Sequence, residues 1–204
     1  FYYITVMNEN YTHPAMPAGV ESDILKGMYL LAEGKGGKKA PRVQLMGSGT
    51  ILREVIAAAE LLDQDFGVAA DVWSCPSFTE LRRDGMEAAR WNLLHPEAAP
   101  RVPHIAKCLD KRVGPAVVAT DYMRIFAEQV RPYVDRRYTV LGTDGFGRSD
   151  TREQLRRFFE VNRFYVVVAA LKALADEGTI PAVTVTQAIR KYQIDPEKAA
   201  PWRV

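Results

Sequence analysis

Residues 140–152 contain the residue types best suited to binding an anion in this chain. An apolar run ends in a turn with three glycines, and Arg148 and Arg152 follow at the start of a helical pattern. In an open α/β sheet, a loop between a strand and the next helix lies where ligands approach. This segment therefore predicts an anion site or a partner site at the edge of a sheet.

Individual residues of this segment have narrower interpretations. Asp144 precedes Gly145, a pair typical of a turn in which the glycine has a positive φ. Phe146 stands between two glycines and is either a core side chain or an anchor at an interface. Asp150 and Glu153 have the spacing of a capping box with Asp150 as the cap. Arginines of the following helix fit a solvated face equally well, because exposed charges contribute little to stability.

A second glycine turn, Gly47-Ser48-Gly49, also lies between a predicted strand and a predicted helix. Phosphate groups bind at such helix starts. The dinucleotide fingerprint would require a third glycine where Leu52 stands, and neither glycine cluster is followed by the Lys-Ser/Thr of a P-loop. Tight backbone turns explain both clusters better than a bound nucleotide does.

The remaining reactive residues assemble no convincing catalytic centre. His13, His95 and His104 lack the spacing of metal ligands. Cys75 and Cys108 match no metal or redox motif and are expected to be reduced thiols of a cytoplasmic protein. His13 is the histidine best placed to reach a site, because it lies in a proline-containing segment that crosses between two parts of the chain.

Composition limits the classes of partner. The chain has 204 residues, 48% hydrophobic and 25% charged, with a net charge of +2 and interspersed signs. This balance argues against nucleic acid as a partner. An apolar run long enough to span a membrane is absent. The chain opens in a strand-like run without Met or a signal peptide, so we expect a fragment of a longer protein.

The elements that must position these residues alternate along most of the chain. Residues 27–33 and 42–46 are predicted to form an antiparallel hairpin. Strands and helices then alternate, which predicts a mostly parallel sheet with helices on both faces. The expected strands are 1–7, 70–74, 116–119 and 138–141, and the expected helices are 51–62, 76–94, 122–134, 151–159, 161–177 and 183–192.

Four stretches together resemble the C-terminal part of the homodimeric, bacterial-type decarboxylating component of the pyruvate dehydrogenase complex. A more distant resemblance is to transketolase, whose C-terminal domain has a similar Phe-Gly-x-Ser element, here residues 146–149. The stretches are Met7-Asn8-Glu9-Asn10-Tyr11 through Pro14-Ala15-Met16-Pro17, Leu45 through Arg53, Ser77-Phe78-Thr79-Glu80-Leu81 with Asp84-Gly85 and Arg90-Trp91-Asn92, and Val140 through Arg152 with Phe159-Glu160-Val161.

The resemblance implies a three-layer α/β/α sandwich around a five-stranded mixed sheet with one antiparallel strand. It implies that residues 1–19 are the end of a preceding domain and a connector, and that residues 20–204 are a transketolase C-terminal-like domain. It further implies a bacterial, cytoplasmic enzyme of the step after glycolysis that decarboxylates pyruvate and reductively acetylates lipoyl groups. In such an enzyme upstream domains hold thiamine diphosphate and Mg²⁺, so no cofactor or metal is expected on this fragment.

The resemblance transfers no catalytic or cofactor-binding residue to this chain. The implied partners are a second subunit, forming a homodimer, and the dihydrolipoyl acetyltransferase core. We expect a mainly structural domain, with channel or interface candidates at His13, Asp144, Phe146, Arg148 and Arg152. Two alternatives stay open: a free-standing α/β module that binds an anion at a strand-to-helix loop, and a related enzyme that acts on another 2-oxo acid or a sugar.

Overall fold

One five-stranded sheet organises the chain, and the computed structural model describes residues 1, 3–4, 9–37 and 39–204. The strand order is β1-β3-β2-β4-β5, with β1 antiparallel to β3 and every other pair parallel. The mixed sheet with one antiparallel strand is therefore confirmed. The strands are β1 (Tyr29–Ala32), β2 (Arg42–Gly47), β3 (Ala69–Ser74), β4 (Ala116–Ala119) and β5 (Tyr138–Leu141).

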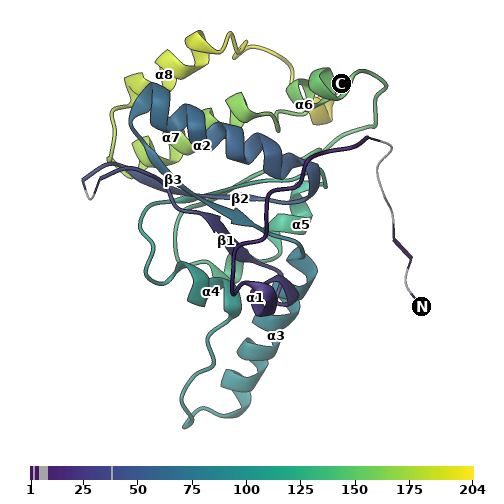
Figure 1. Cartoon of the computed structure of the whole chain (residues 1–204), viewed down its shortest axis with the longest axis vertical. Coiled ribbons are helices and arrows are strands. Elements are labelled where there is room, and N and C mark those ends of the chain that lie inside the picture. Colours follow the sequence, from purple (N-terminus) through teal and green to yellow (C-terminus); the bar gives the residue numbers. More distant parts are fainter. Residues whose placement is uncertain (2, 5–8, 38) are drawn as a thin grey trace.

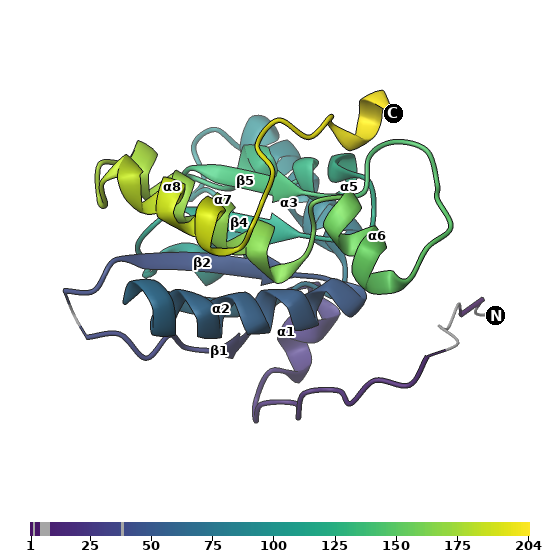
Figure 2. The same ribbon diagram turned by 90° about the horizontal axis from the view of Figure 1, so that it is seen from above.

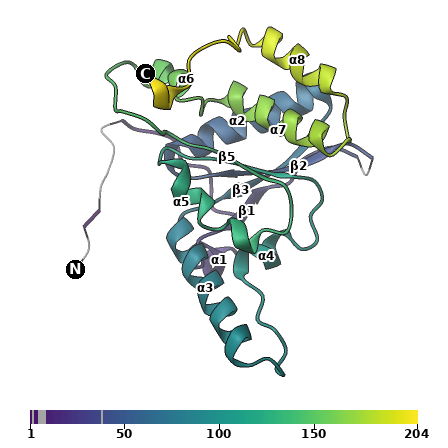
Figure 3. The same cartoon turned by 180° about the vertical axis from the view of Figure 1, so that it is seen from behind.

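Helices cover both faces of the sheet, which makes the predicted three-layer sandwich (Figures 1, 2 and 3). One face carries α2 (Leu52–Phe66), α7 (Arg163–Asp176) and α8 (Ala182–Lys191). The other face carries α1 (Glu21–Leu25), α3 (Phe78–Leu94), α4 (His104–Leu109) and α5 (Arg124–Glu128). The short α6 (Arg152–Phe158) and the 3-10 turns η1 (Gly49–Ile51), η2 (Arg131–Tyr133) and η3 (Pro201–Arg203) complete the elements.

The central strands divide the core into two halves. Because successive side chains of a strand point to opposite faces, Leu45 and Val117 belong to the cluster under α2 and α7. Their neighbours Met46 and Val118 belong to the cluster under α3 and α4. All four side chains are fully buried, as is typical of parallel strands covered on both faces.

The predicted hairpin between residues 27–33 and 42–46 is wrong. The β1 strand pairs with β3, for instance Tyr29 with Ser74, and β3 lies between β1 and β2. The nine-residue connection 33–41 is long enough to pass the width of one strand. Strand β2 is buried along five of its six residues, so it lies in the sheet interior between β3 and β4, whereas the shorter β1 lies at the edge.

The helix predicted over residues 122–134 is also too long, because α5 ends at Glu128 and a 3-10 turn follows. Pro132 explains the break, since a proline clashes with the carbonyl four residues earlier, which is that of Glu128. The helix begins at Arg124, whose backbone N–H donates to the Asp144 carboxylate at 3.1 Å. The predicted Thr120-Asp121 cap is therefore replaced by a side chain from the loop after β5.

Two further expectations concern the N-terminal strand and membrane spans. The strand expected over residues 1–7 falls largely outside the described residues, which omit 2 and 5–8. In the described part of the chain, no helix combines the length and the apolar character that crossing a membrane requires.

Candidate functional site

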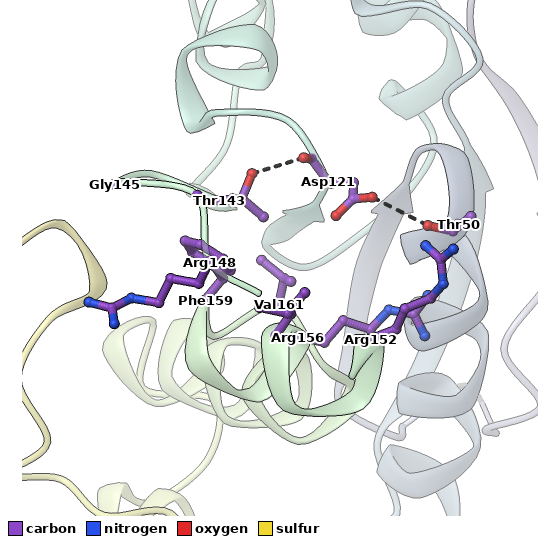
Figure 4. A pocket seen from close by; sticks show the side chains of 11 residues that line it. Thr50, Asp121, Thr143, Gly145, Arg148, Arg152, Arg156, Phe159 and Val161 are labelled. Atoms are coloured by element: carbon purple, nitrogen blue, oxygen red, sulfur yellow. Dashed lines mark hydrogen bonds between the residues drawn. The ribbon is translucent and has the colours of Figure 1, made fainter. Parts of the chain in front are cut away.

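A cleft of about 280 Å³ opens where the parallel strands β2, β4 and β5 end (Figure 4). Three chain segments that follow these strands meet here, because parallel strands present their carboxyl ends at one edge of the sheet. One wall is polar and the opposite wall, from α6 and the residues after it, is apolar. The polar wall consists of Thr50, Asp121 and Thr143, and the apolar wall of Leu155, Phe159 and Val161.

Hydrogen bonds hold the polar wall together. The Thr143 hydroxyl donates to the Asp121 backbone carbonyl at 2.8 Å. The Thr50 hydroxyl donates to the Asp121 carboxylate at 3.5 Å (Figure 4). Below them the Ser48 and Thr120 hydroxyls are buried and lie 2.7 Å apart. The loops after the three strands are therefore linked by short polar side chains.

Arginines line the cleft on the α6 side. Arg148, Arg152 and Arg156 contribute to its lining, and Figure 4 shows Arg152 and Arg156 extending toward Thr50, which lies in η1 just before α2. Arg148 extends to the opposite side, where its guanidinium lies 4.5 Å from the centre of the Phe158 ring. Two of the three guanidinium groups are thus placed near the polar wall.

The buried carboxylate of Glu54 binds two arginines, Arg163 and the cleft residue Arg156. Its two oxygens accept from the backbone N–H of Arg163 at 2.9 Å and from its guanidinium at 2.9 and 3.1 Å. The Arg156 guanidinium lies 3.4 Å away. Burial would raise the pKa of the Glu54 carboxyl, but the hydrogen bonds and charges of the arginines outweigh it, so this pKa lies below its usual value.

Residues 9–11 of the N-terminal part are bound at the same place. Arg152 forms a 2.6 Å ion pair with Glu9. The guanidinium of Arg53 lies 4.2 Å from the centre of the Tyr11 ring, and the Tyr11 hydroxyl lies 3.5 Å from Arg156. Arginines of α2 and α6 therefore hold residues 9–11 of the same chain against the rim of the cleft.

Residues 27–162 match the sequence model described as "Transketolase-like TK C-terminal domain". This chain belongs to the transketolase-like C-terminal domain family. The domain is also 63% identical over its whole length to the "Pyruvate dehydrogenase E1 component" of Cupriavidus necator, and covers 23% of that protein. Against the Escherichia coli K12 protein of the same description it is 56% identical over 98% of this chain and 22% of that protein.

Solved structures agree with this fold. A transketolase structure from Campylobacter jejuni matches 79% of this chain and 20% of its own chain with a TM-score of 0.50 at 19% identity. A Pichia stipitis transketolase structure matches 77% and 19% with the same TM-score. The transketolase-like domain thus spans about a quarter of the length of the curated relatives it matches and a fifth of these structures.

A second cleft at the base of α3 offers less chemistry. It measures about 600 Å³ and is lined mostly by glycine, alanine, proline and other uncharged residues, with Asp135 as its charged residue. Its walls are α3 and η2, where the Tyr133 ring packs over Gly85. The cleft at the carboxyl ends of the strands is therefore the candidate site of this transketolase-like domain.

The structure separates the five predicted site residues. Arg148 and Arg152 line the candidate cleft. Asp144 lies beside it as the partner of Arg124, through the backbone N–H and a 3.3 Å ion pair. Phe146 is 84% exposed, which excludes the core interpretation, and His13 is exposed and lines neither cleft. The predicted Asp150 cap is corrected as well, since Thr151 caps α6.

Sequence reasoning missed Glu54, Arg156 and the binding of residues 9–11. The position of Glu54 in the helical pattern does indicate burial. Glu54 stands three residues after Ile51 and one before Val55, on the apolar stripe that helix α2 buries. A carboxylate at such a position requires a cation, because an unpaired buried charge is costly. The Tyr11 and Glu9 contacts had no comparable signal, because their partners lie 42 or more residues away.

The cysteines are poor nucleophiles. Burial raises the pKa of the Cys75 thiol well above its ordinary value. Burial also raises the pKa of the Cys108 thiol, to about 11. Because the thiolate is the reactive form, both are protonated at neutral pH. Over the described residues, no group of three or more His, Cys, Asp and Glu side chains is placed to hold a metal ion.

Replacing Gly145 with alanine is expected to push the C-terminal turn η3 away from the loop after β5. Gly145 has φ +114°, and a Cβ there would lie 2.7 Å from the Pro201 carbonyl oxygen. Strain and overlap together should cost about 1–3 kcal/mol of unfolding free energy. Gly147→Ala is the control, because a Cβ at Gly147 meets nothing within 4 Å. Urea unfolding measures both variants, and equal losses of unfolding free energy would contradict the close packing of Gly145 against Pro201.

Proposed function

We propose that this chain is the C-terminal domain of a thiamine diphosphate-dependent pyruvate dehydrogenase (acetyl-transferring) subunit of a bacterial cytoplasm. The 63% identity over the entire chain to a pyruvate dehydrogenase E1 component carries this proposal. The intact subunit would decarboxylate pyruvate and pass the acetyl unit to lipoyl groups. Residues 1–19 would be the end of the preceding domain and a connector, and residues 20–204 the domain itself.

The described residues do not fit thiamine diphosphate with Mg²⁺. Mg²⁺ in proteins takes oxygen ligands in octahedral geometry. The candidate cleft offers one carboxylate, Asp121, and arginines that would repel the cation. The chemistry of the cofactor therefore belongs to other parts of the longer subunit. Calorimetry of the 204-residue chain should detect no Mg²⁺-dependent binding of thiamine diphosphate, and tight binding that requires Mg²⁺ would contradict this assignment.

The role of this domain would be to position other parts of the subunit. The contacts of Glu9 with Arg152 and of Tyr11 with Arg53 and Arg156 fix the path of the connector against the sheet edge. Such fixation would set where the preceding domain sits. Phe146, 84% exposed beside the cleft, and His13 on the connector would lie in the dimer interface or the channel wall. The second subunit and the dihydrolipoyl acetyltransferase core are the partners that this role implies.

A domain exchange tests the proposal. The matched C-terminal part of the Cupriavidus necator relative is replaced by this chain, and release of CO₂ from pyruvate is measured. We expect activity close to that of the unaltered relative, because 63% of the residues are identical across the exchanged part.

The control exchange uses the C-terminal domain of the Campylobacter jejuni transketolase, which shares the fold at 19% identity. That exchange should not support pyruvate decarboxylation, since its surfaces differ. A folded dimer that carries this chain and releases no CO₂ would contradict the proposed function.

A further inference from the structure

We propose that the cleft at the carboxyl edge of the sheet is a binding site for a small phosphate-bearing molecule, and that Glu9 is its built-in competitor. The phosphate group would occupy the place beside Arg152 that the Glu9 carboxylate takes in this structure. The proposal rests on the contacts of this chain alone, so its test stands independently of the proposed function.

The charge around the cleft favours an anion. The residues that line the cleft carry one carboxylate, that of Asp121, and three guanidinium groups, those of Arg148, Arg152 and Arg156. Glu9 pairs with Arg152 and Glu54 pairs with Arg156. Release of Glu9 therefore leaves one excess positive charge in the cleft.

The donors converge on one part of the cleft. Arg152 and Arg156 are one helical turn apart on α6 and extend in the same direction, toward the Thr50 hydroxyl (Figure 4). Guanidinium groups bind phosphate through paired, charge-assisted hydrogen bonds. Asp121 accepts from Thr50 on the far side at 3.5 Å, which confines a phosphate group to the α6 side. The apolar wall of Leu155, Phe159 and Val161 is left for the rest of the ligand.

Glu9 already shows that an oxyanion binds here. Its carboxylate reaches Arg152 from a different segment of the chain, and its side chain is 49% exposed. Exposed ion pairs are weak, so a phosphate with nearly twice the charge of a carboxylate would replace it. Glu54 differs, because its side chain is 7% exposed and bonded to Arg163. The site thus has one fixed carboxylate and one exchangeable carboxylate.

This exchange would couple ligand and connector. A phosphate group and Glu9 compete for Arg152. Binding of the ligand therefore releases residues 9–11, and binding of the connector lowers the affinity for the ligand. The coupling must be equal in both directions.

The test titrates inorganic phosphate into the 204-residue chain by calorimetry, with sodium chloride holding the ionic strength constant. We expect saturable binding of phosphate and weaker binding of acetate in a parallel titration. Glu9→Gln should tighten phosphate binding about two- to fivefold, because it removes a surface competitor. Arg152→Gln should weaken it about tenfold.

Arg157→Gln is the matched control, because Arg157 is exposed on the same helix, bonds to the Gln193 carbonyl and does not line the cleft. Thermal melts establish that each variant is folded. Hydrogen exchange of residues 9–11 supplies a second readout and should accelerate when phosphate is added. The absence of saturable phosphate binding, weaker binding by Glu9→Gln, or acetate binding as tight as phosphate would overturn the proposal.

Discussion

Replacing Glu54 with glutamine is expected to lower the free energy of unfolding by about 2–3 kcal/mol at neutral pH. The substitution leaves Arg163 and Arg156 without the buried carboxylate that both contact. Removing one partner of a buried pair typically costs about 3–5 kcal/mol. We expect the smaller value because the Arg163 side chain is 43% exposed and regains hydration. Urea unfolding monitored by circular dichroism measures the difference.

The effect of Glu54→Gln should depend on pH. The folded pKa of Glu54 lies below its ordinary value of 4.5. The ionised carboxylate therefore contributes its full stabilisation above about pH 4.5 and loses it as the pH falls through the folded pKa. The difference between the wild-type protein and the variant should shrink over that acidic range. A glutamine variant whose deficit stays constant from neutral to acidic pH would contradict the role of the charge.

Glu87→Gln is the matched control for Glu54→Gln. Glu87 is exposed on helix α3, and such surface substitutions change stability by about 0.5 kcal/mol or less. An equal loss in both variants at neutral pH would show that the arginine contacts of Glu54 contribute no special stability. Proteolysis near residues 9–11 should also respond to Glu54→Gln alone, because Arg156 links Glu54 to Tyr11.

Replacing Gly114 with alanine is expected to cost about 4 kcal/mol or to prevent folding. Gly114 has φ +86°, and a Cβ there would overlap the backbone carbonyl oxygen of Arg42 at the start of β2. Neither partner can yield easily. The adjacent Pro115 carbonyl accepts from the backbone N–H of Gln44 at 2.9 Å, and the Gly114 carbonyl accepts from Arg136 at 3.1 Å. Losses of this size are exceptional for one methyl group.

Gly178→Ala separates backbone strain from overlap. Gly178 follows helix α7 with φ +71°, and a Cβ there would meet nothing within 4 Å. This substitution should cost only about 1–2 kcal/mol, the strain of a left-handed residue with a side chain. Soluble yield and thermal melting compare the two variants. A loss at Gly114 no larger than that at Gly178 would contradict the close approach of the 113–115 loop to β2.

Local patterns predicted most of the elements. Strands 116–119 and 138–141 were predicted with their exact bounds, and the helix predicted over 76–94 ends at the predicted residue. Short apolar runs bounded by turn residues and long helical repeats carry this information within a few neighbouring positions. Pro132 also indicates the end of α5, because a proline is incompatible with the continuation of the helix through residues 129–134.

Pairing between distant segments was not predictable in the same way. The antiparallel partner of β1 is β3, with paired residues 40 to 45 positions apart, and the intervening β2 looks like an equally good partner in sequence. Strand β2 lies in the interior of the sheet because its side chains can be buried on both faces. Asp144 likewise suits its own turn in sequence, and it also supplies the cap of α5, 20 residues earlier.

By itself, the sequence determined the alternating strands and helices, the family resemblance and the prediction of an anion or partner site at residues 140–152. The tertiary structure alone decided which charges meet there. Helical periodicity places Arg152 and Arg156 on one face of α6, but their partners Glu9 and Glu54 come from segments about 100 or more residues away. An ion pair depends on distance in space, and sequence spacing specifies that distance only within one element.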